Sequence, residues 1–149
     1  PGTSSTQPVA TARPTSAPGS TPVGSVGNAT VTAVIASRSG NNIELVIAAS
    51  GEGGQKLGGW AIDVEFDPAR MSIDTCTVTD TSVCNPKYND RTVRIVGTQL
   101  NGNTGELARV KLTMNGSGPT NIQVKPFQCV TPEAAPLTCN AVTFAIPAQ

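Results

Sequence analysis

The stretch 58-GGWAIDVEF-66 alternates apolar and polar side chains with a period of two. One side of the pattern holds Trp60, Ile62, Val64 and Phe66, and the other holds Ala61, Asp63 and Glu65. Successive side chains of a β-strand point to opposite faces of its sheet, so this period predicts a strand with one buried and one exposed face. We therefore expect Trp60 to lie in the core.

Similar short runs recur on both sides of this stretch, separated by turns rich in Gly, Asn and Pro. They cover residues 29–37, 41–49, 91–99, 105–114, 120–127 and 141–146, and the segment 67–73 has room for one turn before a short strand. No segment has a helical period of useful length. Seven or eight short strands joined by turns predict an all-β fold, an antiparallel β-sandwich of the jelly-roll or Ig-like kind.

The composition changes near residue 28. Before it, the chain consists mainly of Ser, Thr, Pro, Gly and Ala, with Arg13 as its only charge. Such a segment buries too little apolar surface to offset its chain entropy. We therefore divide the chain into an extended tail or linker, residues 1–27, and a β-sandwich domain, residues 28–149.

The charge balance excludes two classes of partner. Lys plus Arg number 10 and Asp plus Glu number 10, so the net charge is zero. Nucleic acids and anionic membrane surfaces need a basic footprint, which this chain lacks. No apolar run reaches the length of a membrane span. The charged fraction of 13% suits a secreted protein that associates with others.

Four cysteines, with no histidine and no CxxC spacing, favour disulfides over zinc. Of the three pairings that four cysteines allow, we favour Cys76–Cys84 and Cys129–Cys139, because each pair flanks a turn-rich segment. Disulfides indicate an extracellular or cell-surface location.

Three other polar patterns in the chain are site candidates. Asn28 and Asn115 begin Asn-X-Ser/Thr triplets and are candidates for glycosylation. Asp63, Glu65 and Asp67 alternate along one strand face and are a candidate Ca²⁺ site, although a solvated outer face explains them better.

The sequence shows no catalytic constellation. Without histidine, the acids, bases and nucleophiles of hydrolytic enzymes reduce to scattered carboxylates, lysines and serines. The glycine-rich segment 51–59 lacks the following helix that a phosphate-binding loop requires. We therefore expect a non-enzyme that needs no cofactor. Tyr88 is the one aromatic residue that we expect to be exposed for stacking on a sugar ring.

The stretch 58-GGWAIDVEFDPARMSI-73 resembles the strand-and-turn signature of cohesin-like β-sandwich domains, within the dockerin-binding and carbohydrate-binding-module superfamily. In that signature an aromatic-Asp-Pro ends one strand and an apolar residue opens the next; here these positions are Phe66, Asp67, Pro68 and Met71. Independently of the resemblance, Pro68 presets its backbone φ and Asp67 can accept hydrogen bonds from turn amides.

The resemblance continues in 93-VRIVGTQLNGNTGELARVKLTM-114, where 105-GELA-108 leads into a strand, and it covers residues 28–146. It implies a cohesin-like fold. Cohesin-like domains bind helical dockerin modules across one sheet face, so the resemblance also implies a docking face near Asp63, Glu65 and Arg94. The cysteine pairs and the N-terminal tail distinguish this chain from scaffold cohesins.

The tail decides between the function hypotheses. It is a passive linker, a segment folded on its own domain, or a strand added to a neighbouring copy, for which the suitable residues are Gln7, Pro8, Val9, Ala10, Thr11 and Ala12. Head-to-tail contacts of the last kind generate a homo-oligomeric filament. We predict an extracellular structural subunit that assembles in this way. The alternative is a cohesin-type module for a dockerin-like partner, and the third hypothesis is a carbohydrate-binding module.

Overall fold

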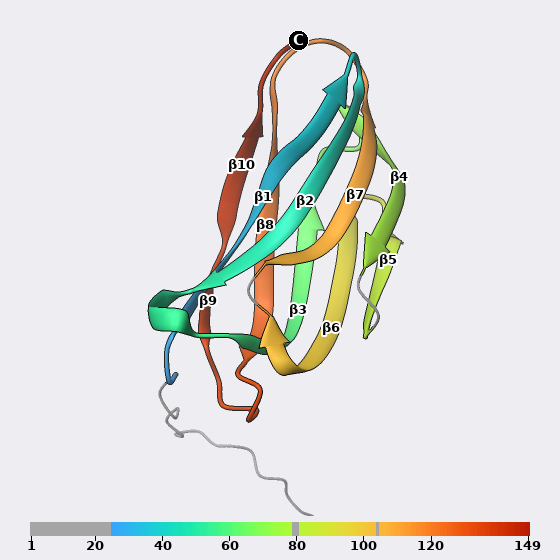
Figure 1. Cartoon of the computed structure of the whole chain (residues 1–149). Helices are drawn as coiled ribbons and strands as arrows, with labels where there is room; N and C mark the ends of the chain where they lie inside the picture. The colour runs from blue at the N-terminus through green and yellow to red at the C-terminus, as the bar shows by residue number, and fades with distance from the viewer. Residues whose placement is uncertain (1–24, 79–80, 104) are drawn as a thin grey trace, which may run out of the picture.

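The computed structural model describes residues 25–78, 81–103 and 105–149, and Figure 1 shows that they form two layers of strands. Sheet A has the order β4 (Met71–Val78), β7 (Glu106–Met114), β2 (Asn42–Gly51), β1 (Asn28–Ser39) and β9 (Thr138–Asn140). Sheet B has the order β10 (Val142–Ile146), β8 (Thr120–Val130), β3 (Leu57–Glu65), β6 (Thr92–Asn103) and β5 (Ser82–Asn89). All paired strands are antiparallel except β1 and β9. The all-β sandwich is confirmed.

The core lies between the two sheets. β3, which contains most of the stretch 58–66, is the middle strand of sheet B. Trp60, Ile62 and Val64 of β3 are at most 2% exposed, as their period predicts. Trp60 pairs directly with Gly97 of β6, where a Cβ atom would lie only 2.6 Å from the indole ring. Gly97 therefore leaves room for the tryptophan and for the Ser82 hydroxyl, which lies nearer still.

The described residues form ten strands, rather than the seven or eight expected from the sequence. The additional strands are β5 and β9. The sequence of β5 has no alternating apolar pattern. Its larger apolar residues, Val83 and Tyr88, are both exposed. β9 has only three residues and is too short for any period to be visible.

The first strand begins at Asn28, and the two residues before it also bond to the sandwich. The Val26 amide donates a hydrogen bond to the Pro136 carbonyl, and the Thr138 amide donates one to the Gly27 carbonyl, both at 2.9 Å. The proposed assembly segment, residues 7–12, lies outside the described residues. Assembly into a filament therefore stays a prediction.

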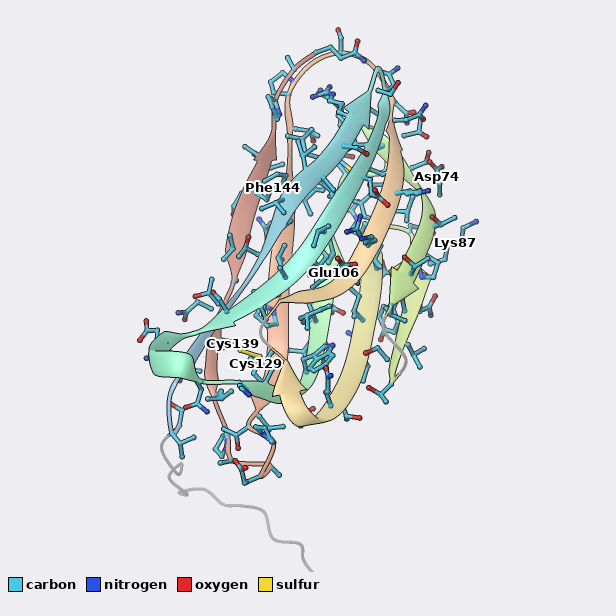
Figure 2. The ribbon with its side chains drawn as sticks, in the orientation of Figure 1. Asp74, Lys87, Glu106, Cys129, Cys139 and Phe144 are labelled. Carbon is cyan, nitrogen blue, oxygen red and sulfur yellow. A yellow bond between two sulfur atoms is a disulfide. The ribbon has the colours of Figure 1, made fainter. Side chains whose placement is uncertain are left out.

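Both disulfides join one sheet to the other. Cys76–Cys84 connects β4 to β5, with 6.1 Å between the Cα atoms, and Cys129–Cys139 connects β8 to β9, with 6.3 Å. They are the two local pairings that the sequence favours, and Figure 2 shows the second of them near β9. Because β4 and β5 are edge strands on one side of the sandwich and β9 is an edge strand on the other, both open sides are cross-linked.

Helical structure in the described part of the chain is confined to one short turn, Glu52–Gly54. Within the same residues, no helix has the length and apolar character needed to cross a membrane.

Candidate docking face

The outer face of sheet B is built from residues that pair across four strands. In one row, Val83 of β5 lies opposite Val96 of β6, and Val96 lies opposite Ala61 of β3. In the next row, Arg94 of β6 lies opposite Asp63 of β3. Residues directly opposite in antiparallel strands point to the same side of the sheet. Because Ile62 and Ile95, which alternate with these residues, are buried, both rows face outward. Ala61, which the sequence places on the exposed side, is only 6% exposed, because its small side chain lies between Val96 and Gln128 of the adjacent strands.

Arg94 and Asp63 form a bidentate ion pair at the centre of this face. Arg94 Nε donates to Asp63 Oδ1 and Arg94 Nη2 donates to Asp63 Oδ2, each at 2.7 Å. These hydrogen bonds are the main reason why the pKa of Arg94 is raised above its ordinary value. The side chain of Arg94 is 30% exposed and that of Asp63 is 16% exposed, so the pair is accessible and also held in place.

Two aromatic rings flank the guanidinium of Arg94. Its Cζ atom lies 3.8 Å from the centroid of the Tyr88 ring and 4.7 Å from that of Phe127, distances typical of cation–π contacts. The three side chains come from three different strands, β5, β6 and β8. The cluster Tyr88–Arg94–Phe127, which we call the aromatic clamp, therefore spans most of the width of the sheet.

The strand pairing is irregular at both rings. In β8, Pro126 pairs with Ile62 and Gln128 pairs with Ala61, so Phe127 is the extra residue of a β-bulge. In β5, Asn85 pairs with Arg94 and Asn89 pairs with Thr92, so residues 86–88 all lie opposite Val93 alone. Bulges change the direction of a side chain relative to regular alternation, and in β5 the irregular pairing directs Tyr88 toward Arg94. Phe127 already faces outward by alternation with the buried Ile122 and Val124.

Large apolar side chains are exposed on this face to an unusual extent. Val83 is 70% exposed, Phe127 55%, Tyr88 46% and Val96 45%, and the described residues include only two other exposed large apolar side chains, Val26 and Val34. Exposed apolar clusters of this kind typically mark interaction sites. Tyr, Arg and Phe are also enriched in the buried centres of protein interfaces. The outer face of sheet B is therefore the candidate docking face.

The structure does not assemble the three candidate Ca²⁺ ligands into a cage. Asp63 is paired with Arg94, and Glu65 Oε1 lies 2.9 Å from Lys125 Nζ. Asp67 accepts a hydrogen bond from the Ala69 amide in the turn after β3, as expected for Asp before Pro. Among the described residues, no group of three or more potential ligands could hold a metal ion. Asp63 and Glu65 instead balance cations on the docking face.

Of the other residues that the sequence singles out, Tyr88 belongs to this face and Trp60, Asn28 and Asn115 do not. Trp60 is buried and unavailable for sugar stacking, and the exposed Tyr88 is stacked on Arg94. Asn28 and Asn115, the glycosylation candidates, are both exposed. The side-chain amide of Asn28 donates a hydrogen bond to the carboxylate of Glu52. Sequence reasoning missed Phe127, although alternation with Ile122 and Val124 places it on the outer face of its strand.

No protein-family model matches the chain, and no curated protein matches it. Solved structures do. The sixth cohesin of scaffoldin B from Acetivibrio cellulolyticus, solved in complex with a Cel5 dockerin variant, has a TM-score of 0.66 and 10% identity, covering 83% of this chain and 99% of that one. The cohesin CaCohA2 from Clostridium acetobutylicum has a TM-score of 0.65 and 11% identity, covering 83% and 92%.

A third similar structure is the cohesin module of a family 33 glycoside hydrolase from Clostridium perfringens, with a TM-score of 0.63 and 15% identity, covering 83% of this chain and 97% of that one. These similarities extend over nearly the whole sandwich. The chain has a cohesin-like fold. The cohesin resemblance of residues 58–73 and 93–114 is thus confirmed at the level of the fold.

Proposed function

We propose that this chain is a non-catalytic, extracellular docking module that binds a dockerin-like protein through the outer face of sheet B. The observation that carries the proposal is the aromatic clamp at the centre of an exposed apolar face. The cohesin of Acetivibrio cellulolyticus, which has a similar fold, was solved with a dockerin bound. Two disulfides suit a protein that works outside the cell.

The chemistry of the face favours a protein partner over a sugar. Sugar-binding platforms need free aromatic faces, whereas one side of the Tyr88 ring is occupied by Arg94. The central charges are paired within the face, Asp63 with Arg94 and Glu65 with Lys125. A partner therefore meets apolar side chains and a neutralised ion pair, a surface that suits the apolar side of a helix.

Calorimetric titration tests the proposal. The probes are the dockerin-like modules of the organism that produces this chain, loaded with Ca²⁺ and titrated into the full chain. Val96→Asp places an unpaired charge on the docking face, and Val34→Asp is the matched control, because Val34 is a similarly exposed valine on sheet A. We expect Val96→Asp to weaken binding about tenfold or more and Val34→Asp to leave it unchanged.

Two results would contradict the proposal. One is that no dockerin-like module binds the wild-type chain. The other is that Val34→Asp weakens binding as much as Val96→Asp, which would place the contact elsewhere on the sandwich.

A further inference from the structure

Strand β5 carries one end of the docking face but has few backbone bonds to its sheet. It pairs with β6 from Ser82 to Asn85 and again at Asn89, with three unpaired residues between. Pro86, in this gap, has no amide hydrogen to donate. The Lys87 amide donates to the side chain of Asn85, 3.0 Å away, rather than to β6. As an edge strand, β5 has no second neighbour in the sheet.

The side chains of β5 also contribute little to the core. None of them is fully buried. Cys84 is the one β5 residue among the apolar side chains that belong to the core or pack against it. Val83 and Tyr88, the larger apolar residues, point outward into the docking face. Burial of apolar surface, the main force that fixes most strands, is therefore weak for β5.

On the side facing sheet A, β5 is joined to β4 by the Cys76–Cys84 bond. Toward the other end of the two strands, a hollow of about 410 Å³ lies between them, lined by Met71 and Ile73 of β4 and by Pro86 and Asn89 of β5. Figure 1 shows the two strands side by side at one edge of the sandwich, and Figure 2 labels Asp74 of β4 and Lys87 of β5 at that edge. Because of this hollow, side-chain packing between β4 and β5 does not hold the two strands together here in the way that the disulfide does at the other end.

We propose that the Cys76–Cys84 disulfide positions β5, and with it Tyr88 and Val83, in the docking face, so that affinity for the partner depends on this bond. The part concerning affinity rests on the proposed function, whereas the part concerning the position of β5 does not. Cys76 and Cys84 act through Tyr88 and are positioning residues.

The second disulfide provides a matched control. Its sequence separation is 10 residues, against 8 for Cys76–Cys84, so the two bonds restrain similar lengths of chain. However, Cys129 lies on β8, which pairs with both β3 and β10. β10 reaches only as far as Val124, but Gln128, Cys129 and Val130 all pair with β3, and the Cys129 carbonyl accepts a hydrogen bond from the Leu137 amide. Because these backbone pairs remain when the bond to Cys139 is removed, we expect Phe127 to stay in place.

The first experiment needs no partner. Tyr88 is the single tyrosine of the chain, so the full chain labelled with 3-fluorotyrosine gives one ¹⁹F resonance from the aromatic clamp. We expect Cys76→Ser/Cys84→Ser to shift or broaden this resonance and to speed amide exchange in residues 82–89 about tenfold or more. Cys129→Ser/Cys139→Ser should change neither. An unchanged resonance in the first variant, or equal changes in both, overturns the proposal.

A check on folding accompanies these measurements. The single Trp60 is buried, and its fluorescence reports whether each variant keeps its core. If the serine variant fails to fold, Cys76→Ala/Cys84→Val retains apolar packing without the bond. If this variant also fails while Cys129→Ser/Cys139→Ser folds, the bond is required for the whole fold, and its specific role in positioning β5 is overturned.

The second experiment measures affinity with a dockerin-like module that binds the wild-type chain. Removal of Cys76–Cys84 should raise Kd about tenfold or more, and removal of Cys129–Cys139 should change it less than about twofold. If the ¹⁹F resonance responds and Kd does not, the dependence of affinity on the bond is overturned. If no such module binds the wild type, the proposed function fails, and the ¹⁹F result still decides how β5 is held.

Discussion

Arg94 and Asp63 face each other across β6 and β3 and share two hydrogen bonds of 2.7 Å. With Tyr88 and Phe127 against its guanidinium, Arg94 has little rotamer freedom left to lose when a partner binds. Ordering a flexible arginine at an interface normally opposes association. In this face the fold has already ordered it, which makes Arg94 well suited to be the centre of a docking surface.

Arg94→Lys should weaken binding of a dockerin-like module about tenfold, because lysine keeps the charge but provides neither the bidentate fork nor a planar group to stack. Arg109→Lys is the control: Arg109 forms a similar bidentate pair with Glu106, at 2.7 and 2.9 Å, on sheet A. Calorimetry on both variants checks the expectation. Equal losses would show that the clamp has no special role in binding.

Trp60→Ala should lower the free energy of unfolding by about 3–5 kcal/mol, because it removes a large side chain from the core. Trp60→Phe should cost clearly less. The indole Nε1 is buried and has no hydrogen-bond partner among the described residues, so phenylalanine loses volume but no hydrogen bond. Urea unfolding measures both. A silent alanine variant would mean that Trp60 is exposed and would return attention to sugar binding.

Gly97→Ala should destabilise the chain by about 1–3 kcal/mol, since its methyl group would overlap Ser82 Oγ and the Trp60 ring. Gly118→Ala is a suitable control, because its nearest contact is the far end of the Arg70 side chain, which donates a hydrogen bond to the Pro119 carbonyl. The cost at Gly97 should shrink in a Trp60→Phe background, which removes part of the overlapping indole. Additive effects of the two substitutions would assign the cost to Ser82 Oγ rather than to the indole.

The sequence predicts the layers of the fold better than it predicts the docking face. The alternation in 58–66 assigns Asp63 and Glu65 to the outer face correctly, because that information is local. Their partners, Arg94 and Lys125, lie on other strands, and the pairing register that brings them together cannot be read from either segment alone. The resemblance to cohesins indicated Arg94 as part of the face but not its bond to Asp63.

The aromatic clamp is harder still to predict. Regular alternation from Ile122 and Val124 places Phe127 on the outer face but does not show that Tyr88 and Arg94 lie beside it. Tyr88 reaches Arg94 because residues 86–88 of β5 lie opposite Val93 alone. β5 was missed for a related reason, because a strand with no buried apolar face has no period to detect. Both failures occur at the candidate site, where side chains are exposed and burial leaves no pattern in the sequence.

The ion pair on the opposite face gives a pH-dependent prediction. Hydrogen bonds from Arg109 lower the pKa of Glu106 in the folded chain. A carboxylate whose pKa is lower in the folded chain than in the unfolded chain stabilises the fold at pH values above its unfolded pKa. This stabilisation is lost as the pH falls through the pKa of the folded chain. Glu106→Gln should therefore be slightly less stable than wild type near neutral pH and equal to it in strong acid.

Both side chains of this pair are more than 40% exposed, so the difference should be small and should decrease further in salt. Urea unfolding at about pH 7 and about pH 2.5, with and without added salt, measures it. A difference that grows on acidification would have the wrong sign for a lowered pKa. Binding of a dockerin-like module should not change, since Glu106 lies on sheet A.

Removal of residues 1–24 separates filament assembly from docking. The truncated chain should begin at Ser25, because Val26 and Gly27 share hydrogen bonds with the segment around Pro136 and Thr138, and Ser25 itself bonds to Thr138. Cut at this point, the sandwich keeps all of these bonds and should unfold at the same temperature as the full chain. The docking face is also intact, so affinity for a dockerin-like module should not change.

If the tail drives assembly, sedimentation should show large species for residues 1–149 and a monomer for residues 25–149. Large species from both chains would place the self-association on the sandwich, and monomers from both would leave the tail without a role in assembly.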